Sequence, residues 1–321
     1  MSQLQLAPKV VALIDTVEIA DGALKAEHAG EVFEAETPAG MARQLGNAFY
    51  ETMHSGRDKL PDLKQRSLRE RAFDALLHDA TGGRTTVVEV QVLEAADTDE
   101  TIVAVDGLRL RVPNEFLEAG TGTAASMTLP CARPGLSPGF FLATSGNVPF
   151  RHTGALLRMY GRLEDPDAAP EVWRALVAFL EDARIPWQAK ISSNRSIYPR
   201  NDAVVVYLPR PGWRAARACA QALQGTELLA AGTSPFTRAL TASVSCAFEP
   251  TDTRGSRRGV SFGQHRAQVF AEALVRHAAM PATDREPVTD TLYAAFVDAD
   301  IDPAEPARNL SSPVVDVLSP F

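Results

Sequence analysis

Cationic and phenolic side chains stand at alternate positions in two apolar segments of the chain. In residues 156–163, Arg158 and Tyr160 alternate with apolar side chains, and in residues 187–192 Lys190 does the same. Successive side chains of a strand point to opposite faces of its sheet. Two such strands would pack one face into a core and present cations around a phenol on the other. The alternative is a row of solvent-exposed charges on an open sheet face.

A further cation, Arg200, lies in the sequence Tyr-Pro-Arg-Asn-Asp at residues 198–202, between Tyr198 and Asp202. The apolar residues 203–208 follow directly, and such a run is typical of a central strand that is buried on both faces. If the three strands are neighbours, Arg200 converges with the other cations and the phenol on one concave surface.

The residues after Ser261 predict a helix with an arginine in an unusual place. Ser261 and Gln264 form the pattern of a capping box. Arg266 shares the inward side of this helix with Phe270, four residues later, although a cation in the first turn is disfavoured by the helix dipole. Anion binding would explain both features, because a helix N-terminus and an arginine together favour phosphate. A buried structural salt bridge is the alternative.

Histidine and cysteine patterns give no support to a metal site. His152 lies in a loop before the strand at residues 156–163, whereas His54 and His78 fall in helical segments, where histidines are more often structural. The three cysteines are scattered, and the chain has no C-x-x-C or H-E-x-x-H spacing. The G-x-S-x-G, P-loop and dinucleotide-binding patterns are also absent. We therefore expect neither a metal nor an organic cofactor.

Composition and charge narrow the class of protein. The chain has 321 residues, of which 45% are hydrophobic and 22% charged, as in an ordinary globular protein. Its net charge of −8 argues against a general nucleic-acid binder. The N-terminus lacks the pattern of a signal peptide, and no segment reaches the roughly 20 apolar residues of a membrane helix. We expect a cytoplasmic protein that binds neither nucleic acid nor membrane.

The helices and strands that must position these residues change in kind near Gly83, from predicted helices before it to predicted strands after it. Helices are predicted at about 41–53 and 68–77, the second with a capping box at Ser67 and Glu70 and a stop at Gly82-Gly83. Residues 1–84 are thus expected to be a helical N-terminal region. Residues 85–93 and 101–112 are rich in β-branched side chains and predict strands.

From residue 137 onward, predicted strands and helices alternate. The segments expected to be strands are 140–144, 156–163, 187–192, 203–208 and 243–248, and the expected helices lie at about 173–180, 213–223, from 261, and 288–299. This order predicts an α+β fold with a mixed, largely antiparallel sheet flanked by helices.

Five short motifs of the chain occur in an order that resembles the HopA-type effector family. They are Ser137-Pro138-Gly139-Phe140-Phe141, Arg158-Met159-Tyr160, Ile185-Pro186-Trp187 with Lys190, Tyr198-Pro199-Arg200-Asn201-Asp202 and Ser261-Phe262-Gly263-Gln264-His265-Arg266. Residues 49–56 and 107–113 resemble the same family. Its members include the lyase components of class V lanthipeptide and thioamitide biosynthesis, and it is remotely similar to the phosphothreonine lyases of bacterial pathogens. The resemblance implies a phosphothreonine-lyase-like domain at 85–321 and leaves 1–84 for peptide or partner docking.

The resemblance also implies roles for individual residues. The related lyases use a lysine base and a histidine acid among phosphate-binding arginines. Lys190 matches the base by its strand context, whereas Tyr160 falls where those lyases carry the acid histidine. The proton donor is therefore either Tyr160 itself or His152 from the loop. The implied phosphate-binding residues are Arg158, Arg200 and Arg266, and the supporting residues are Tyr198, Asp202 and His265.

This chemistry suits the residue types. Elimination needs a base that removes a Cα proton, and a lysine does so as the neutral amine, which neighbouring cations favour. Guanidinium groups suit the leaving phosphate because their planar fork binds its oxygens in pairs. The sequence therefore predicts a lyase that forms dehydroalanine or dehydrobutyrine in a precursor peptide phosphorylated by a separate kinase. The alternative is a catalytically silent phosphopeptide-binding or effector-like interaction module.

Overall fold

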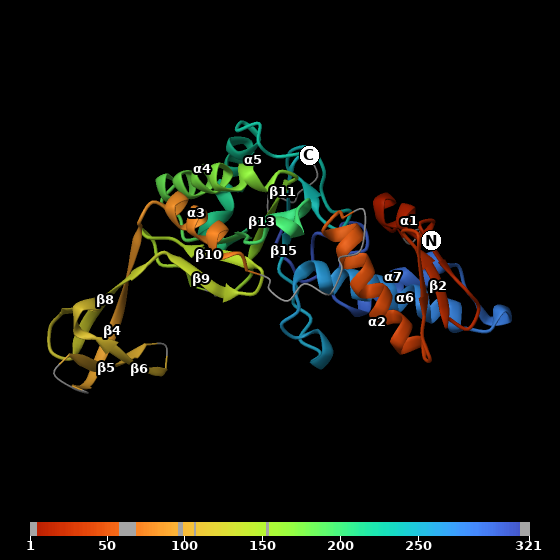
Figure 1. The fold of residues 1–321 in the computed structure, drawn as a ribbon. Coiled ribbons are helices and arrows are strands. Elements are labelled where there is room, and N and C mark those ends of the chain that lie inside the picture. The colour runs from red at the N-terminus through yellow and green to blue at the C-terminus, as the bar shows by residue number, and fades with distance from the viewer. Residues whose placement is uncertain (1–4, 58–68, 96–98, 106, 152–153, 315–321) are drawn as a thin grey trace.

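The computed structural model describes residues 5–57, 69–95, 99–105, 107–151 and 154–314. The chain has an α+β fold built on antiparallel sheets (Figure 1), as the sequence predicted. None of the helices in these ranges combines the length and the apolar composition needed to cross a membrane.

A seven-stranded antiparallel sheet forms the centre of the molecule. Its strands, in spatial order, are β14 (Arg238–Ala239), β15 (Val244–Phe248), β11 (Leu157–Leu163), β13 (Arg200–Leu208), β12 (Gln188–Ser192), β10 (Phe140–Thr144) and β9 (Ala132–Ser137). The strands predicted at 140–144, 156–163, 187–192, 203–208 and 243–248 are confirmed, with β13 beginning earlier, at Arg200. Nearly every residue of β11 and β13 is buried, because both faces of these central strands are covered.

Three helices cover one face of this sheet (Figure 1): α3 (Arg71–Thr81), α4 (Ala169–Asp182) and α5 (Ala216–Gln224). Trp173, Leu176, Val177 and Leu180 form the predicted stripe of α4 and are all fully buried. Helix α3 begins at Arg71 with Glu70 at its N-cap, where the Glu70 side chain makes no capping hydrogen bond. The predicted cap partner, Ser67, lies outside the described residues.

The N-terminal region is not only helical. Helix α1 (Pro8–Ile14) is followed by a three-stranded sheet of β1 (Val17–Ile19), β2 (Lys25–His28) and β3 (Glu31–Glu34), and then by α2 (Pro38–Phe49). A π-helical turn, η1 (Tyr50–His54), extends α2. Helix α2 packs along α6 (Phe262–Ala279), which also contacts α7 (Val288–Asp298).

A separate five-stranded sheet projects from the rest of the molecule (Figure 1). It comprises β4 (Thr85–Ala95), β5 (Glu100–Val105), β6 (Leu108–Pro113), β7 (Leu117–Ala119) and β8 (Ala124–Pro130). The single strand expected at 101–112 is wrong, because β5 and β6 pair as a hairpin. Gly107 lies in the connection with a φ of +81°, and Asp-Gly is a sequence pattern typical of such turns.

Buried apolar residues of the described chain form two separate cores. Val90, Val103, Val112, Ala125 and Met127 form a small core within the five-stranded sheet. The main core joins residues from both sides of position 84, including side chains of α2, α3, α4 and α6. The segment at 85–130 therefore has a small core of its own, separate from the main core.

Candidate functional site

Tyr160 and Lys190 lie in one cross-strand row of the central sheet. Tyr160 of β11 pairs with Val205 of β13, and Val205 pairs on its other side with Lys190 of β12. Side chains directly opposite each other in paired strands lie on the same face. Because adjacent strands are about 4.8 Å apart, the two Cα atoms are separated by roughly 10 Å. The shared face predicted for the phenol and the lysine is thus what the register shows.

Lys190 is half-buried against aromatic rings. Its Nζ atom lies 4.1 Å from the centroid of the Phe140 ring and 6.0 Å from that of Tyr207. Among the described residues it makes no ion pair with a carboxylate. Cation–π contacts hold an ammonium group in place without consuming its hydrogen-bond donors. The Lys190 amine is therefore positioned but remains available to a ligand.

The hydroxyl of Tyr160 is buried beside the Arg158 guanidinium and has no acceptor for its proton among the described residues. The ring makes edge contact with His54, at a centroid distance of 5.3 Å, and packs on Phe262 at 6.0 Å. Burial raises the pKa of Tyr160, and the nearby Arg158 only partly opposes this, so the phenol stays protonated. A buried O–H group without an acceptor costs about 1–3 kcal/mol, which makes it a natural donor to a bound oxygen.

Arg158 is held by a carboxylate on the same face. Its Nε and Nη2 atoms donate to the two carboxylate oxygens of Glu249, and its guanidinium carbon lies 5.0 Å from the Tyr207 ring centroid. The third nitrogen, Nη1, has no hydrogen-bond partner among the described residues. The Nε–Nη2 edge of the guanidinium therefore binds Glu249, and Nη1 remains for a ligand.

Arg200 forms a buried pair with Asp202. Its Nε donates to Oδ1 of Asp202 at 2.7 Å and its Nη2 to Oδ2 at 3.0 Å. Nη2 also donates to Tyr50 Oη at 3.0 Å and to Ser55 Oγ at 3.1 Å. Burial raises the pKa of Asp202, but the adjacent guanidinium outweighs it and leaves the pKa below its ordinary value. The guanidinium carbon of Arg200 lies 5.7 Å from the centroid of the Phe140 ring, which the Lys190 ammonium group also contacts.

The η1 turn supplies site residues that sequence reasoning missed. His54, which we expected to be structural, lies over Tyr160, with its Nδ1 3.0 Å from Ser234 Oγ and its Nε2 3.9 Å from Asp202 Oδ2. Burial lowers the pKa of His54 to about 4, although Asp202 opposes the shift, so the ring is neutral at physiological pH. A Cβ atom on Gly263 would lie 2.0 Å from the His54 ring, so α6 approaches η1 closely because this residue is glycine. The only sequence signal for the turn was the family-like motif at residues 49–56.

Arg266 and His265 lie in a different cluster. Arg266 is fully buried and donates to oxygen atoms in the segment 306–309, and its guanidinium carbon lies 4.7 Å from the Phe262 ring. His265 contacts Asp252 through Nε2 at 3.3 Å and Arg266 through Nδ1 at 2.8 Å. These contacts fasten α6 to the C-terminal segment. This geometry does not support the phosphate-binding role expected of Arg266. Protein oxygens of the segment 306–309 already accept the hydrogen bonds of its guanidinium.

Of the remaining predicted residues, one supports a strand of the site. Tyr198 donates from Oη to the backbone oxygen of Ser192 at 2.9 Å, so it braces β12 two residues after Lys190. His152 lies outside the described residues. Within those residues, no three histidine, cysteine, aspartate or glutamate side chains come together in a way that could hold a metal ion.

Comparison with known proteins places the chain in a family. The sequence pattern of the HopA1 effector protein family matches residues 131–308, a segment that contains Tyr160, Lys190 and Arg200. No curated protein matches the chain. The solved structures that are similar to it include two effector proteins. An effector protein from Pseudomonas syringae pv. tomato strain DC3000 is 15% identical, with a TM-score of 0.48 over 86% of this chain and 91% of that one. An effector protein from Pseudomonas syringae pv. syringae strain 61 is 13% identical, with a TM-score of 0.44 over 85% and 90%. Because the family pattern spans more than half of the sequence, the chain belongs to the HopA1 effector protein family.

Proposed function

We propose that this chain is a lyase that eliminates phosphate from phosphoserine or phosphothreonine in a peptide. The product is dehydroalanine or dehydrobutyrine, the residue type needed for lanthipeptide biosynthesis, and a separate kinase supplies the phosphate. The observation that carries the proposal is the cross-strand row of Lys190 and Tyr160. It places an amine on the same face as a buried hydroxyl, and among the described residues the amine makes no ion pair and the hydroxyl has no acceptor.

In the proposed reaction, the neutral amine of Lys190 removes the Cα proton of the phosphorylated residue. The electron pair of the C–H bond forms the Cα=Cβ double bond, the Cβ–O bond breaks, and the phosphate leaves with the electrons of that bond. Tyr160 donates a proton to the departing phosphate oxygen, with His152 as the alternative donor. Proton transfer by a positioned side chain contributes about 10²–10⁴-fold to such reactions.

The phosphate binds between the two arginines in this proposal. Arg158 and Arg200 each keep Nη1 without a hydrogen-bond partner among the described residues. Hydrogen bonds from a guanidinium to phosphate are short and strong because both partners are charged. Glu249 and Asp202 fix the direction of the guanidinium planes, so the nitrogens are oriented before the ligand arrives.

Mass spectrometry of a phosphopeptide incubated with the protein tests the proposal. We expect a product that has lost phosphoric acid and that reacts with an added thiol at the new double bond. An otherwise identical peptide without phosphate should remain unchanged. A product with its hydroxyl restored would indicate a phosphatase, and binding without any change of mass would indicate the silent phosphopeptide-binding module.

Replacing Tyr160 with phenylalanine separates catalysis from folding. We expect elimination to slow by about a hundredfold, the scale of a lost general acid. The free energy of unfolding should not fall, because the hydroxyl donates to no acceptor in the part of the chain that the structure describes. Single-turnover rates and urea unfolding measure the two quantities. A parent-like rate for Tyr160→Phe together with a slow His152→Ala would assign the acid to His152, and parent-like rates for both variants would contradict both assignments.

A further inference from the structure

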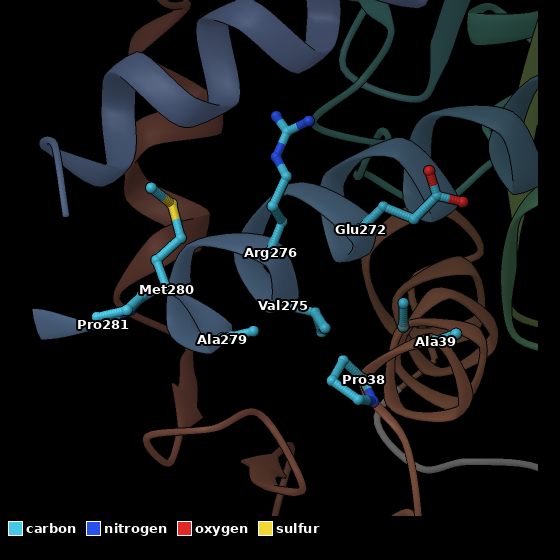
Figure 2. A pocket seen from close by; sticks show the side chains of 9 residues that line it. Pro38, Ala39, Glu272, Val275, Arg276, Ala279, Met280 and Pro281 are labelled. Carbon is cyan, nitrogen blue, oxygen red and sulfur yellow. The ribbon is translucent and has the colours of Figure 1, made fainter. Parts of the chain in front are cut away.

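The charged side chains at the cavity between α2 and α6 are bound to other parts of the protein. The cavity has a volume of about 540 Å³ and is lined by Glu272 and Arg276 among mostly apolar side chains (Figure 2). Glu272 pairs with Arg257. Arg276 points away from the cavity and donates from Nη2 to the backbone oxygen of Thr291 at 3.2 Å. Free polar groups lie instead on the face of the central sheet that carries Lys190.

Tyr207 is placed on that face by the register of the sheet. Among the residues of β13, all of which the structure describes, only Tyr207 is not buried. It pairs with Arg158 of β11 on one side and with Gln188 of β12 on the other, and residues directly opposite each other share a face of the sheet. Lys190 follows Gln188 by two residues on β12 and lies on the same face. The Tyr207 side chain therefore stands between the strand of the proposed base and the strand of a proposed phosphate-binding arginine.

Two aromatic rings connect three cations on this face. The centroid of the Tyr207 ring lies 5.0 Å from the guanidinium carbon of Arg158 and 6.0 Å from Nζ of Lys190. The centroid of the Phe140 ring lies 4.1 Å from the same Nζ and 5.7 Å from the guanidinium carbon of Arg200. Lys190 thus contacts both rings, and each ring also contacts one of the arginines. Phe140 contributes a ring alone, whereas Tyr207 also brings a hydroxyl to the cations.

The hydroxyl of Tyr207 is free, whereas that of Tyr160 is enclosed. The Tyr207 oxygen is accessible to solvent and makes no hydrogen bond among the described residues. The Tyr160 oxygen, on the same face, is buried. Burial raises the pKa of Tyr160, and Glu249 and Tyr207 add to this shift, which indicates that the two phenols lie near each other. A ring that served only to pack against cations would not need this oxygen.

We propose that Tyr207 is a substrate-binding residue whose hydroxyl donates a hydrogen bond to an oxygen of the substrate phosphate. The phosphate then lies beside Nη1 of Arg158, and donors from two neighbouring strands hold it. Hydrogen bonds to a phosphate oxygen are strong because the acceptor is charged. The inference rests on the proposed function for the identity of the ligand. It assigns no proton transfer to Tyr207, so it applies whether Tyr160 or His152 is the acid.

Titration of a phosphopeptide into the full-length Lys190→Ala protein tests the proposal without turnover. Adding Tyr207→Phe removes the hydroxyl and keeps the ring against Arg158. We expect the affinity for the phosphopeptide to fall by about tenfold to a hundredfold, the scale of one hydrogen bond to a charged group. The affinity for the same peptide without phosphate should not change. Tyr293→Phe, the same substitution at a half-buried tyrosine of α7, should leave both affinities unaltered.

A second variant at this position separates the ring from the hydroxyl. Tyr207→Leu removes both, so Arg158 also loses its ring contact, and phosphopeptide binding should be at least as weak as in Tyr207→Phe. Unchanged phosphopeptide affinity in Tyr207→Phe, or an equal loss for the two peptides, would overturn the role of Tyr207 and leave the lyase proposal intact. A parent protein that neither binds nor eliminates the phosphopeptide would overturn both.

Discussion

Replacing Lys190 with alanine should reduce the rate of dehydroamino acid formation by at least about a hundredfold, the scale of a lost acid–base group. Lys190 lies half-buried on β12 and makes no ion pair among the described residues, so its removal leaves no carboxylate without a partner. The fold should remain intact. Binding of the phosphopeptide should also persist, since the Nη1 groups of Arg158 and Arg200 are still present. Single-turnover kinetics and phosphopeptide titration measure the two effects.

Matched variants identify what Lys190 contributes. Lys190→Arg keeps a positive charge on the same strand, but a guanidinium does not lose its proton in proteins. If Lys190 acts as the base, Lys190→Arg should be as inactive as Lys190→Ala. If Lys190 acts only through its positive charge, Lys190→Arg should restore the rate. Lys25→Ala, at an exposed lysine of β2 that pairs with Glu34, should retain the parent rate. Elimination at near-parent rate by Lys190→Ala would refute the mechanism.

The sequence could predict which face of the sheet a site residue points to, because side chains alternate along each strand. Side chains on β11 and β12 alternate between the two faces of the sheet, so Tyr160 and Lys190 were expected to share one surface if their strands were neighbours, and the register meets this condition. What covers that surface could not be predicted in the same way. Glu249 meets Arg158 across 91 residues of sequence, and Tyr50 meets Arg200 across 150 residues. Periodicity within one element carries no information about contacts at such separations.

The surroundings of Arg266 could not be predicted for the same reason. The sequence showed a cation in a helix first turn, where an anion was the simplest compensation. The structure compensates it with oxygen atoms of the segment 306–309, about which residues 261–270 contain no signal. The β5–β6 hairpin differs, because the sequence does contain a signal for it: the Asp-Gly pattern at residues 106–107 interrupts the run of β-branched and apolar residues from which a single strand was expected.

Replacing Arg200 with alanine should destabilise the protein by about 3–5 kcal/mol, because it leaves a buried carboxylate without its partner. Only 7% of the Asp202 side chain is exposed, and Arg200 supplies two of its hydrogen bonds. Tyr50 and Ser55 lose a partner as well. Urea unfolding at neutral pH measures the change. Arg195→Ala breaks a more exposed pair with Glu70 and should cost no more than about 1 kcal/mol.

The pH dependence and a double variant show whether the cost comes from the carboxylate. The folded-state pKa of Asp202 lies below the unfolded value of about 3.9, so the stabilisation by the pair is fully present above that pH and is lost as the pH falls further. The difference between parent and Arg200→Ala should therefore be constant near neutrality and shrink only in acid. Replacing both partners with apolar residues should recover much of the lost stability, because no charge is then buried alone. A stable Arg200→Ala protein that loses only phosphopeptide affinity would mean that Arg200 is held for the ligand and that Asp202 does not need it.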